Sequence, residues 1–303
     1  MNRVALLGNA GVTWRERVKS LAKSGLFLNL DPGNADFTHP GKVGLYRNGR
    51  VLFERFTGSG DPGRTPHLLM WAVGEAMIRF PDEPIVALFP AYRPSPLSWQ
   101  TTLAAMQMFR PDLIEVAHGT GVDLNAFPIG PTLVEGDKAF PGMVRSAQRK
   151  AHWMALLEQC NRHTVNIFKI PIEGARLGSG QRLDTDECRQ VGLDGACAEA
   201  IGPSLCIVSE HAYDETQISR ALDFTHTAKA FFAHPADYEG LVCAFVRQSG
   251  EEFGYGRISK IDFETGEAEV LNTAEIDAPV RILRLGSIRI DTKGNEYEEA
   301  RPW

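Results

Sequence analysis

The sequence has no apolar run long enough to cross a membrane. Its longest runs, such as Leu26 to Leu28 and Ile85 to Phe89, are far shorter than the roughly 20 residues of a membrane helix. The first residues, MNRVALLGNAG, are interrupted by glycine too early for a secretory signal. We therefore expect a soluble, cytoplasmic protein without a membrane partner.

Metal-ligand pairs and hydrolase motifs are also absent from the sequence. The five cysteines form no CxxC pair and have no matching histidine spacing for zinc, so we interpret them as reduced, mostly buried thiols. The eight histidines contain no HxxxH pair, and there is no GxSxG motif. The sequence gives no support to a zinc enzyme or a serine hydrolase.

A surplus of basic residues is lacking as well. The chain has 32 Lys and Arg against 38 Asp and Glu, a formal net charge of -6. Because phosphate contacts need clustered cations, this charge argues against non-specific nucleic-acid binding by the whole surface. Any site for an RNA or DNA end must be local, and we place it around residues 138 to 182, where Lys and Arg outnumber Asp and Glu.

Apolar runs alternate with helical spacing over the first two thirds of the chain. The run VALLG, a glycine turn, the helical stretch TWRERVKSLAKSG and the buried run LFLNLDPG predict a first βαβ unit. Further helices are expected in HLLMWAVGEAMIRF, SWQTTLAAMQMFR and residues 141 to 161, and further strands in EPIVALFP, DLIEVAHG and TVNIFKIPI. The alternation predicts an α/β fold with a parallel sheet flanked by helices, followed by a loop in GARLGSGQRLDTDE.

The pattern changes near Pro203. Short strand-like runs follow one another with turns between them, such as LVCAFVRQ, GYGRISKIDF, EAEVLNT and VRILRLGSIRID. A chain of 303 residues can form one large and one small domain. We predict domains at 1–200 and 201–303, the second small and β-rich.

The turn after the first strand has part of the chemistry of a phosphate-binding loop. Such a loop needs glycines whose neighbouring N–H groups surround the anion, a lysine for the phosphates and a Ser or Thr for magnesium. In LGNAGVTWRE, Gly8 and Gly11 suit the backbone role and Thr13 the magnesium role, but Val12 stands where lysine is expected. A glycine turn between strand and helix occurs in most α/β proteins, so this turn alone does not predict a nucleotide site.

The segment after the second strand supports a nucleotide site. LNLDPGNADFTHPGKVGL resembles the D/E-L-D-x-G-Q and P-P-G segment of the polynucleotide 5′-hydroxyl kinases, which act in RNA 3′-end formation, tRNA splicing and ribosomal RNA maturation. The matching residues are Asp31, Gly33, Pro40 and Gly41, while Asn29 replaces the acidic residue and Asn34 the glutamine.

The resemblance implies a fold of the P-loop NTPase type, with ATP and Mg²⁺ as cofactors. It implies that Asp31 acts near the metal and the attacking hydroxyl, and that Thr13 and Asp31 hold the magnesium. The ATP phosphates would be cradled by Gly8, Asn9, Ala10, Gly11, Val12 and Thr13. The alternative for Asp31 is an ordinary turn residue before Pro32.

Three later segments extend the resemblance. FTGSGDPGRTPHLLMWAV, with Gly58, looks like the family's aromatic-x-G-x-x-x-P stretch, and PGMVRSAQRKAHWMALLEQC looks like its lid, at about 140–162. The C-terminal runs, ending in RLGSIRID, resemble the family's small β domain. Arg145 and Arg149 are the expected catalytic lid residues, because arginines can stabilise charge on a transferring phosphoryl group. Substrate contacts are expected from Asn34, Gly58, Tyr92 and Lys150.

The family's T-x-G-W loop is absent from the corresponding segment, PIVALFPAYRPSPLSW. Tyr92 or Trp99 could supply an aromatic clamp, and ordinary loop packing is the alternative for both. The missing lysine could be replaced from nearby by one of four cations that the sequence does not place, namely Arg15, Lys19, Lys23 and Lys42.

Two functions follow from these residues. The first is ATP-dependent phosphoryl transfer to the 5′-hydroxyl of RNA or DNA. The second is a catalytically inactive relative that binds a nucleotide, an RNA end or a protein partner. Val12, Asn29, Asn34 and the missing T-x-G-W favour the second, because all four departures fall on the chemistry.

Overall fold

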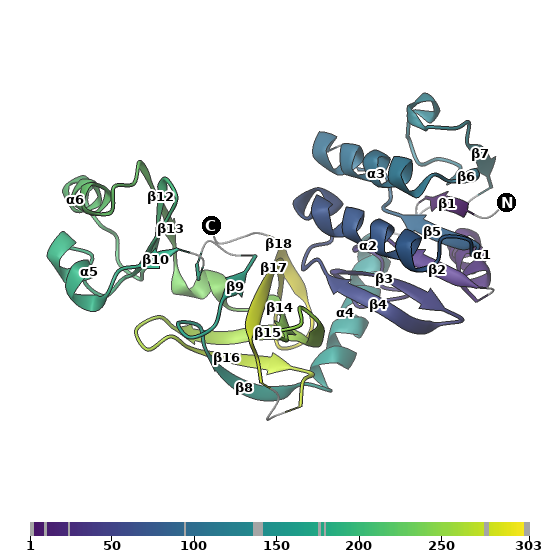
Figure 1. Ribbon diagram of the computed structural model, residues 1–303. Helices are drawn as coiled ribbons and strands as arrows, with labels where there is room; N and C mark the ends of the chain where they lie inside the picture. The colour runs from purple at the N-terminus through teal and green to yellow at the C-terminus, as the bar shows by residue number, and fades with distance from the viewer. Residues whose placement is uncertain are drawn as a thin grey trace. The chain divides into compact units, whose positions relative to one another are not determined.

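The computed structural model describes the whole chain except residues 1–2, 9–10, 24, 94, 136–141, 175–176, 179, 276–278 and 300–303. It divides into two compact units, Met1–His152 and Trp153–Trp303. In Figure 1 the first unit runs from purple to blue and the second from teal to yellow. No helix in the described part of the chain is long and apolar enough to span a bilayer.

The N-terminal unit is built on one sheet in which β2, β5, β1, β6 and β7 are parallel and β3 and β4 are antiparallel. The spatial order is β4-β3-β2-β5-β1-β6-β7. This confirms the expected α/β class. The strands are β1 Arg3–Leu7, β2 Leu26–Asn29, β3 Lys42–Arg47, β4 Arg50–Phe56, β5 Ile85–Phe89, β6 Leu113–Ala117 and β7 Thr132–Val134.

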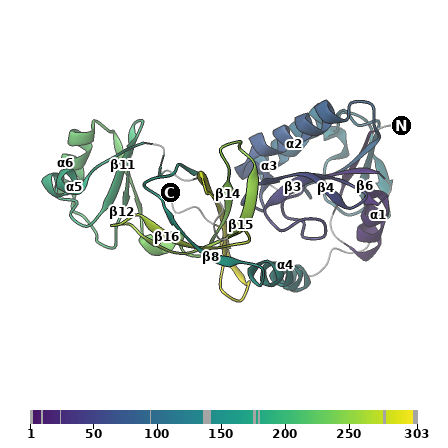
Figure 2. The ribbon, with the colours of Figure 1, turned by 60° about the horizontal axis from the view of Figure 1, so that its bottom comes forward.

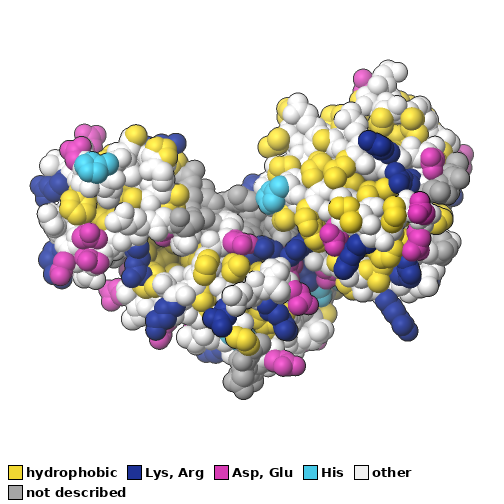
Figure 3. All heavy atoms as spheres, in the orientation of Figure 1, with side chains coloured by type: hydrophobic (Ala, Val, Ile, Leu, Met, Phe, Trp, Pro, Cys, Tyr) yellow, Lys and Arg dark blue, Asp and Glu magenta, His cyan; other side chains and the backbone are white. Residues whose placement is uncertain are grey.

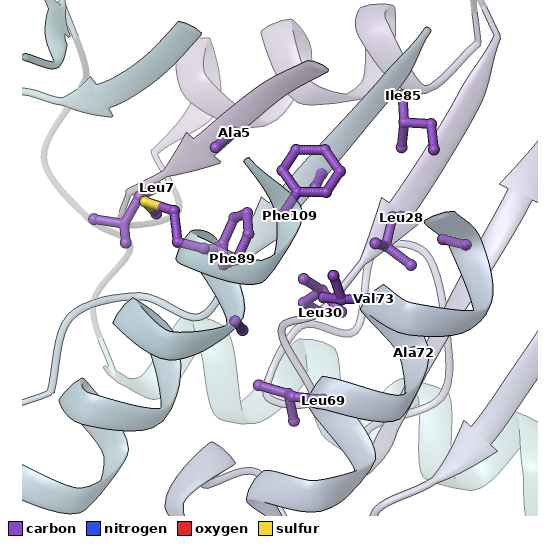
Figure 4. Packing of buried hydrophobic residues seen from close by; sticks show 14 of the residues in the cluster. Ala5, Leu7, Leu28, Leu30, Leu69, Ala72, Val73, Ile85, Phe89 and Phe109 are labelled. Carbon is purple, nitrogen blue, oxygen red and sulfur yellow. The ribbon is translucent and has the colours of Figure 1, made fainter. Parts of the chain in front are cut away.

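Helices cover both faces of this sheet, as Figure 2 shows. Helix α1 packs on one face through Trp14 and Val18, while α2 and α3 bury apolar side chains against the other. Figure 4 shows this second core, where Phe89 of β5 meets Phe109 of α3. The helical elements of the unit are α1 Val12–Ala22, η1 Pro62–Arg64, α2 Pro66–Arg79, α3 Pro96–Phe109 and η2 Leu124–Ala126.

The β3–β4 hairpin at the edge of the sheet was not predicted as a pair. Its turn is Asn48-Gly49, with φ of 51° and 77°, the left-handed region that two-residue hairpin turns require. An Asn-Gly dipeptide between apolar runs is a strong hairpin signal, so the sequence contained the information.

The C-terminal unit contains two sheets. One has the order β18-β17-β14-β15-β16-β8, with β9 beside β17, and the other has the order β10-β11-β12-β13 with α5 and α6 packed on it. The elements are β8 Asn161–Asn166, β9 Ile172–Glu173, β10 Gln181–Arg182, α5 Thr185–Val191, β11 Cys197–Ile201, β12 Ser204–Val208, α6 Glu215–Thr225, β13 Lys229–Ala233, η3 Pro235–Tyr238, β14 Leu241–Val246, β15 Glu252–Asp262, β16 Glu267–Asn272, β17 Ile282–Ile290 and β18 Glu296–Glu299. The β-rich C-terminal part is therefore present.

The division between the units differs from the boundary expected at 200/201, which falls inside β11. Strand β11 pairs with β12 in a hairpin, and β8 pairs with β16 over its whole length. These long-range pairings place residues from 153 onward with the C-terminal strands. Helix α4, Gly142–Leu157, contains the division.

One segment predicted as a loop, GARLGSGQRLDTDE, contains β10 and the start of α5. The helix begins with a reciprocal capping box, in which the Asp184 side chain accepts from the Glu187 N–H and the Glu187 side chain accepts from the Asp184 N–H. The Asp-x-x-Glu spacing is a signal for the start of a helix, but the neighbouring glycines favoured the interpretation of the segment as a loop.

Candidate phosphate site

The turn after β1 begins with a glycine that packing requires. A Cβ built on Gly8 would lie 2.5 Å from the Cβ of Ala117 on β6 and 3.0 Å from the Trp14 ring. No side chain fits at this approach, so the glycine is explained without any ligand. Asn9 and Ala10 lie outside the described residues.

The N-terminus of α1 presents backbone donors. Gly11 is the N-cap, in extended conformation, and within the described part of the chain no side chain caps it; the first turn also holds no acidic residue. Val12 is 51% exposed and Thr13 is exposed beside it. Helix N-terminal N–H groups and the helix dipole favour an anion, so a phosphate fits this end of α1.

Asp31 lies in the loop directly after β2. Its carboxylate accepts the Gly33 N–H at 2.9 Å, and the Asp31 N–H donates to the Asn29 side-chain oxygen at 3.2 Å. The bond to Gly33 is the turn-stabilising role that was the structural alternative for this residue. It uses one acceptor site of a carboxylate that has about four.

Two arginines stand beside Asp31. Arg149 of α4 donates to the Gly33 carbonyl at 2.8 Å, and Arg93 donates to the Gly60 carbonyl at 2.7 Å. Burial raises the pKa of Asp31, and the Arg93 charge, the Gly33 bond, the Arg149 charge and a backbone bond from Ala91 oppose the rise. The result is a half-buried carboxyl group within the field of two guanidinium groups.

The strand order puts these groups in one row. In the sequence β2-β5-β1 across the sheet, Asp31 follows β2, Arg93 follows β5, and the glycine turn follows β1. All three strands are parallel, so their carboxyl ends lie at the same edge. Ligands of open α/β sheets bind at this edge.

Two of the four cations proposed as replacements for the lysine form ion pairs with acidic side chains. Arg15 forms an ion pair with Asp36, and Lys42 pairs with Glu54 at 3.1 Å. Lys19 is half-buried and Lys23 is exposed at the far end of α1. Arg15 and Lys42 thus have their charge compensated within the protein.

Gly41 and Gly58 connect the segment after β2 with the segment after β4 through backbone hydrogen bonds. The Gly58 and Thr57 N–H groups donate to the Gly41 carbonyl, and the Gly41 N–H donates to the Pro32 carbonyl at 2.8 Å. Gly58 has a φ of 62°, which favours glycine. Asn34 accepts the Asp36 N–H at 2.6 Å, so both predicted substrate residues have structural roles here.

The aromatic residues considered as a clamp contact each other. The Tyr92 ring meets the Trp99 ring edge-on at 5.2 Å, and Trp99 meets Phe127 at 5.9 Å. Trp99 also packs against the core under α3. Both rings therefore take part in packing, and a clamp role for either stays a prediction.

The predicted lid residues occupy one helix, α4, but differ in environment. Arg145 is exposed and Lys150 is half-buried, while Arg149 reaches Gly33. His152 lies edge-on to His39, with ring centres 6.5 Å apart. Residues 138–141 of the predicted basic patch lie outside the described residues, and Figure 3 shows Lys and Arg side chains scattered among others on the face in view. A basic patch stays a prediction.

Thr13 and Asp31 offer too few oxygen ligands to bind Mg²⁺ by themselves, so phosphate oxygens of a substrate would have to complete the coordination. Mg²⁺ takes oxygen ligands, commonly one or two carboxylates together with substrate phosphates. The Asp31 carboxylate is an oxygen donor of that kind, and the Thr13 hydroxyl is a neutral oxygen donor. Among the described residues, no group of three or more His, Cys, Asp or Glu side chains forms a protein-only metal cage.

The whole chain was compared with known proteins. No protein-family model and no curated protein matches it. A structure of Clp1p, solved in work on its extended interface with Pcf11p and on ATP loss in a point mutant, matches with a TM-score of 0.56 at 11% identity, over 95% of this chain and 74% of that chain. The chain has the fold of Clp1p. A second Clp1p structure, the wild-type complex with Pcf11p, matches with a TM-score of 0.53 at 11% identity, again over 95% of this chain and 74% of that chain.

The match supports the expected fold class, a mixed α/β unit followed by a β-rich C-terminal part. Arg93 is the residue beside Asp31 that sequence reasoning missed. It lies in the segment that stands where the family has its T-x-G-W loop.

Proposed function

We propose that this chain is a polynucleotide 5′-hydroxyl kinase-like protein that transfers a phosphoryl group from ATP to the 5′-hydroxyl of RNA or DNA. The observation that carries the proposal is the row at the carboxyl edge of the sheet. Arg93 follows the strand next to β1 and Asp31 follows the strand after that, while Arg149 of α4 reaches the loop of Asp31 through the Gly33 carbonyl.

In the proposed reaction the substrate's 5′-oxygen attacks the γ-phosphorus. A bond forms between these two atoms, the bond from phosphorus to the β–γ bridging oxygen breaks, and ADP leaves. Asp31 accepts the hydroxyl proton. Its raised pKa makes it a stronger base than an ordinary carboxylate, which brings it closer to the working pH of a general base.

Other residues of the chain would position the substrates and neutralise the negative charge of the phosphates. The α1 N-terminus would bind the ATP phosphates, and Arg149 and Arg145 of α4 would lie toward the transferring group. A magnesium ion held by Thr13 and Asp31 would supply neutralisation of phosphate charge. Asn34, Gly58, Tyr92 and Lys150 remain the proposed contacts of the polynucleotide end.

A second candidate function is supported by Val12. An exposed valine occupies the lysine position, and the nearby cations Arg15 and Lys42 are paired with acids. On this proposal the chain binds nucleotide or a partner without transfer. The two Clp1p structures contain Clp1p with Pcf11p, which supports a protein-binding role for a chain of this fold.

One assay separates the two functions. The purified chain is incubated with ATP labelled in the γ-phosphate and with 5′-hydroxyl oligomers of RNA and of DNA. Asp31→Asn removes the proton acceptor while keeping its shape, and should reduce transfer by about 100-fold or more. Asp82→Asn, an exposed aspartate before β5 at the opposite edge of the sheet, is the control and should have no effect.

The outcomes are distinct. Transfer that depends on Asp31 supports the kinase function and rules out the inactive relative. ATP binding by calorimetry without transfer supports the second function. If neither transfer nor ATP binding is measurable, the nucleotide site itself is wrong.

A further inference from the structure

Arg93 is an exposed cation between the two ends of the candidate site. It stands four residues after β5, the strand that lies between β2 and β1. A group bound between the helix N-terminus after β1 and Asp31 after β2 must therefore pass the loop that carries Arg93. This is the place that a transferring phosphoryl group would occupy.

Three polar groups converge around Gly33. A Cβ built there would lie 3.2 Å from the Asp31 Oδ1, 3.4 Å from the Arg93 Nη2 and 3.4 Å from the Gly60 carbonyl oxygen. Since glycine carries no side chain, the guanidinium approaches the carboxylate closely enough for its charge to oppose the rise in the pKa of Asp31 that burial causes. The position of Arg93 is thus defined by the surrounding backbone.

The N–H groups of Arg93 that do not bond to Gly60 are suitable donors for a phosphate. A guanidinium has five N–H donors, and the bond to Gly60 engages one of them. Its partner in that bond is a neutral carbonyl, in contrast to the ion pairs of Arg15, Arg17 and Lys42 with carboxylates. Arginine is suited to phosphate because its planar fork can bind two oxygens at once.

Building on the proposed nucleotide site, we propose that Arg93 supplies the positive charge for a bound phosphate group that the glycine turn lacks at Val12. The ligand class is a nucleoside polyphosphate, bound through its terminal phosphates. Arg93 bridges the phosphates at α1 and the carboxylate of Asp31, and so stands in for the lysine from a different loop.

The test measures binding rather than catalysis. Calorimetry at low ionic strength and in a salt series is carried out with two probes, ATP and inorganic tripolyphosphate, on the full chain. Arg93→Gln should weaken both probes by about tenfold or more, because a charge-assisted hydrogen bond is lost. Arg93→Lys keeps the positive charge but lacks the planar guanidinium group, so its affinity for both probes should lie between those of the wild type and Arg93→Gln.

The control is Arg50→Gln, the same charge change at the exposed end of the β3–β4 hairpin, on the opposite edge of the sheet. It should leave both affinities unchanged. Thermal unfolding of every variant is measured alongside. An affinity loss in Arg93→Gln with an unchanged midpoint, and partial recovery in Arg93→Lys, supports the inference.

Three results would overturn it. Arg93→Gln that binds tripolyphosphate within twofold of the wild type shows that the charge comes from elsewhere, while the nucleotide site stands. Equal affinity losses in Arg93→Gln and Arg93→Lys, together with lowered midpoints, show a structural role only. If the wild type binds neither probe, both this inference and the proposed nucleotide site are wrong. Binding that depends on Arg93, without phosphoryl transfer, contradicts only the proposed kinase activity and leaves this inference in place.

Discussion

Replacing Gly8 by alanine would force a methyl group against the methyl group of Ala117. The two carbons would be 2.5 Å apart, and the new Cβ would also meet the Trp14 ring at 3.0 Å and 3.2 Å. Carbon atoms in contact prefer about 3.5–4.0 Å, so β1 and β6 or the start of α1 must move by about 1 Å. This displacement occurs directly at the candidate phosphate site.

The magnitude follows from overpacking. Extra methyl groups in a packed interior cost roughly 1–3 kcal/mol, and a Gly-to-Ala change recovers about 0.4–1 kcal/mol by restricting the unfolded chain. We expect Gly8→Ala to lower the free energy of unfolding by about 1–2 kcal/mol. Ala117→Gly removes the opposing methyl group, so the double variant should recover about 1 kcal/mol relative to the sum of the two single changes.

The measurement is urea unfolding of the full chain, with hydrogen exchange of the β1 and β6 amides to assign the transition to the N-terminal unit. Gly25→Ala is the control, since a Cβ there has open space around it. It should leave stability unchanged or slightly higher. A Gly8→Ala variant as stable as the wild type, or additive effects in the double variant, would refute the packing explanation and return Gly8 to a purely ligand-binding role.

Two further predictions concern the same unit. Arg17→Met leaves the Glu115 carboxylate, 9% exposed and held by two bonds at 2.8 Å and 2.5 Å, without its cation. Urea unfolding should show a loss of roughly 2 kcal/mol, whereas the control Arg47→Met, whose partner Glu83 is 49% exposed, should lose under about 1 kcal/mol. Burial lowers the pKa of His39 to about 4, below its ordinary 6.5, so the unfolded chain binds the proton more readily between those values. Stability should be fully present above about pH 6.5 and fall by roughly 3 kcal/mol toward pH 4, and an unfolding series in which His39→Gln keeps the same slope would contradict this.

Local patterns were sufficient for much of the N-terminal unit. The apolar runs that became β1, β2, β5 and β6 were each predicted, because parallel strands buried on both faces are apolar throughout. The helices between them were recognisable from their spacing. Asp31 was proposed as a site residue because its segment can be compared residue by residue with the family's motif, and its role stays a prediction.

Other features depended on contacts between distant segments. The 200/201 boundary failed to match the compact units because β8 and β16, about a hundred residues apart, form one ladder. The pairing of Arg15 with Asp36 and of Lys42 with Glu54 decided which cations have their charge compensated, and no spacing rule predicts such pairs across loops.

The sequence by itself determined the α/β class, the glycine turn with Val12 after it and the place of Asp31 after the second strand, since each depends on residues close together in the chain. Only the tertiary structure decided that Arg93 stands beside Asp31. Strand β5 enters the sheet between β2 and β1, although it follows both in the chain, and hydrogen bonding between strands sets that order. The same packing explains Gly8, whose neighbour Ala117 is more than a hundred residues away.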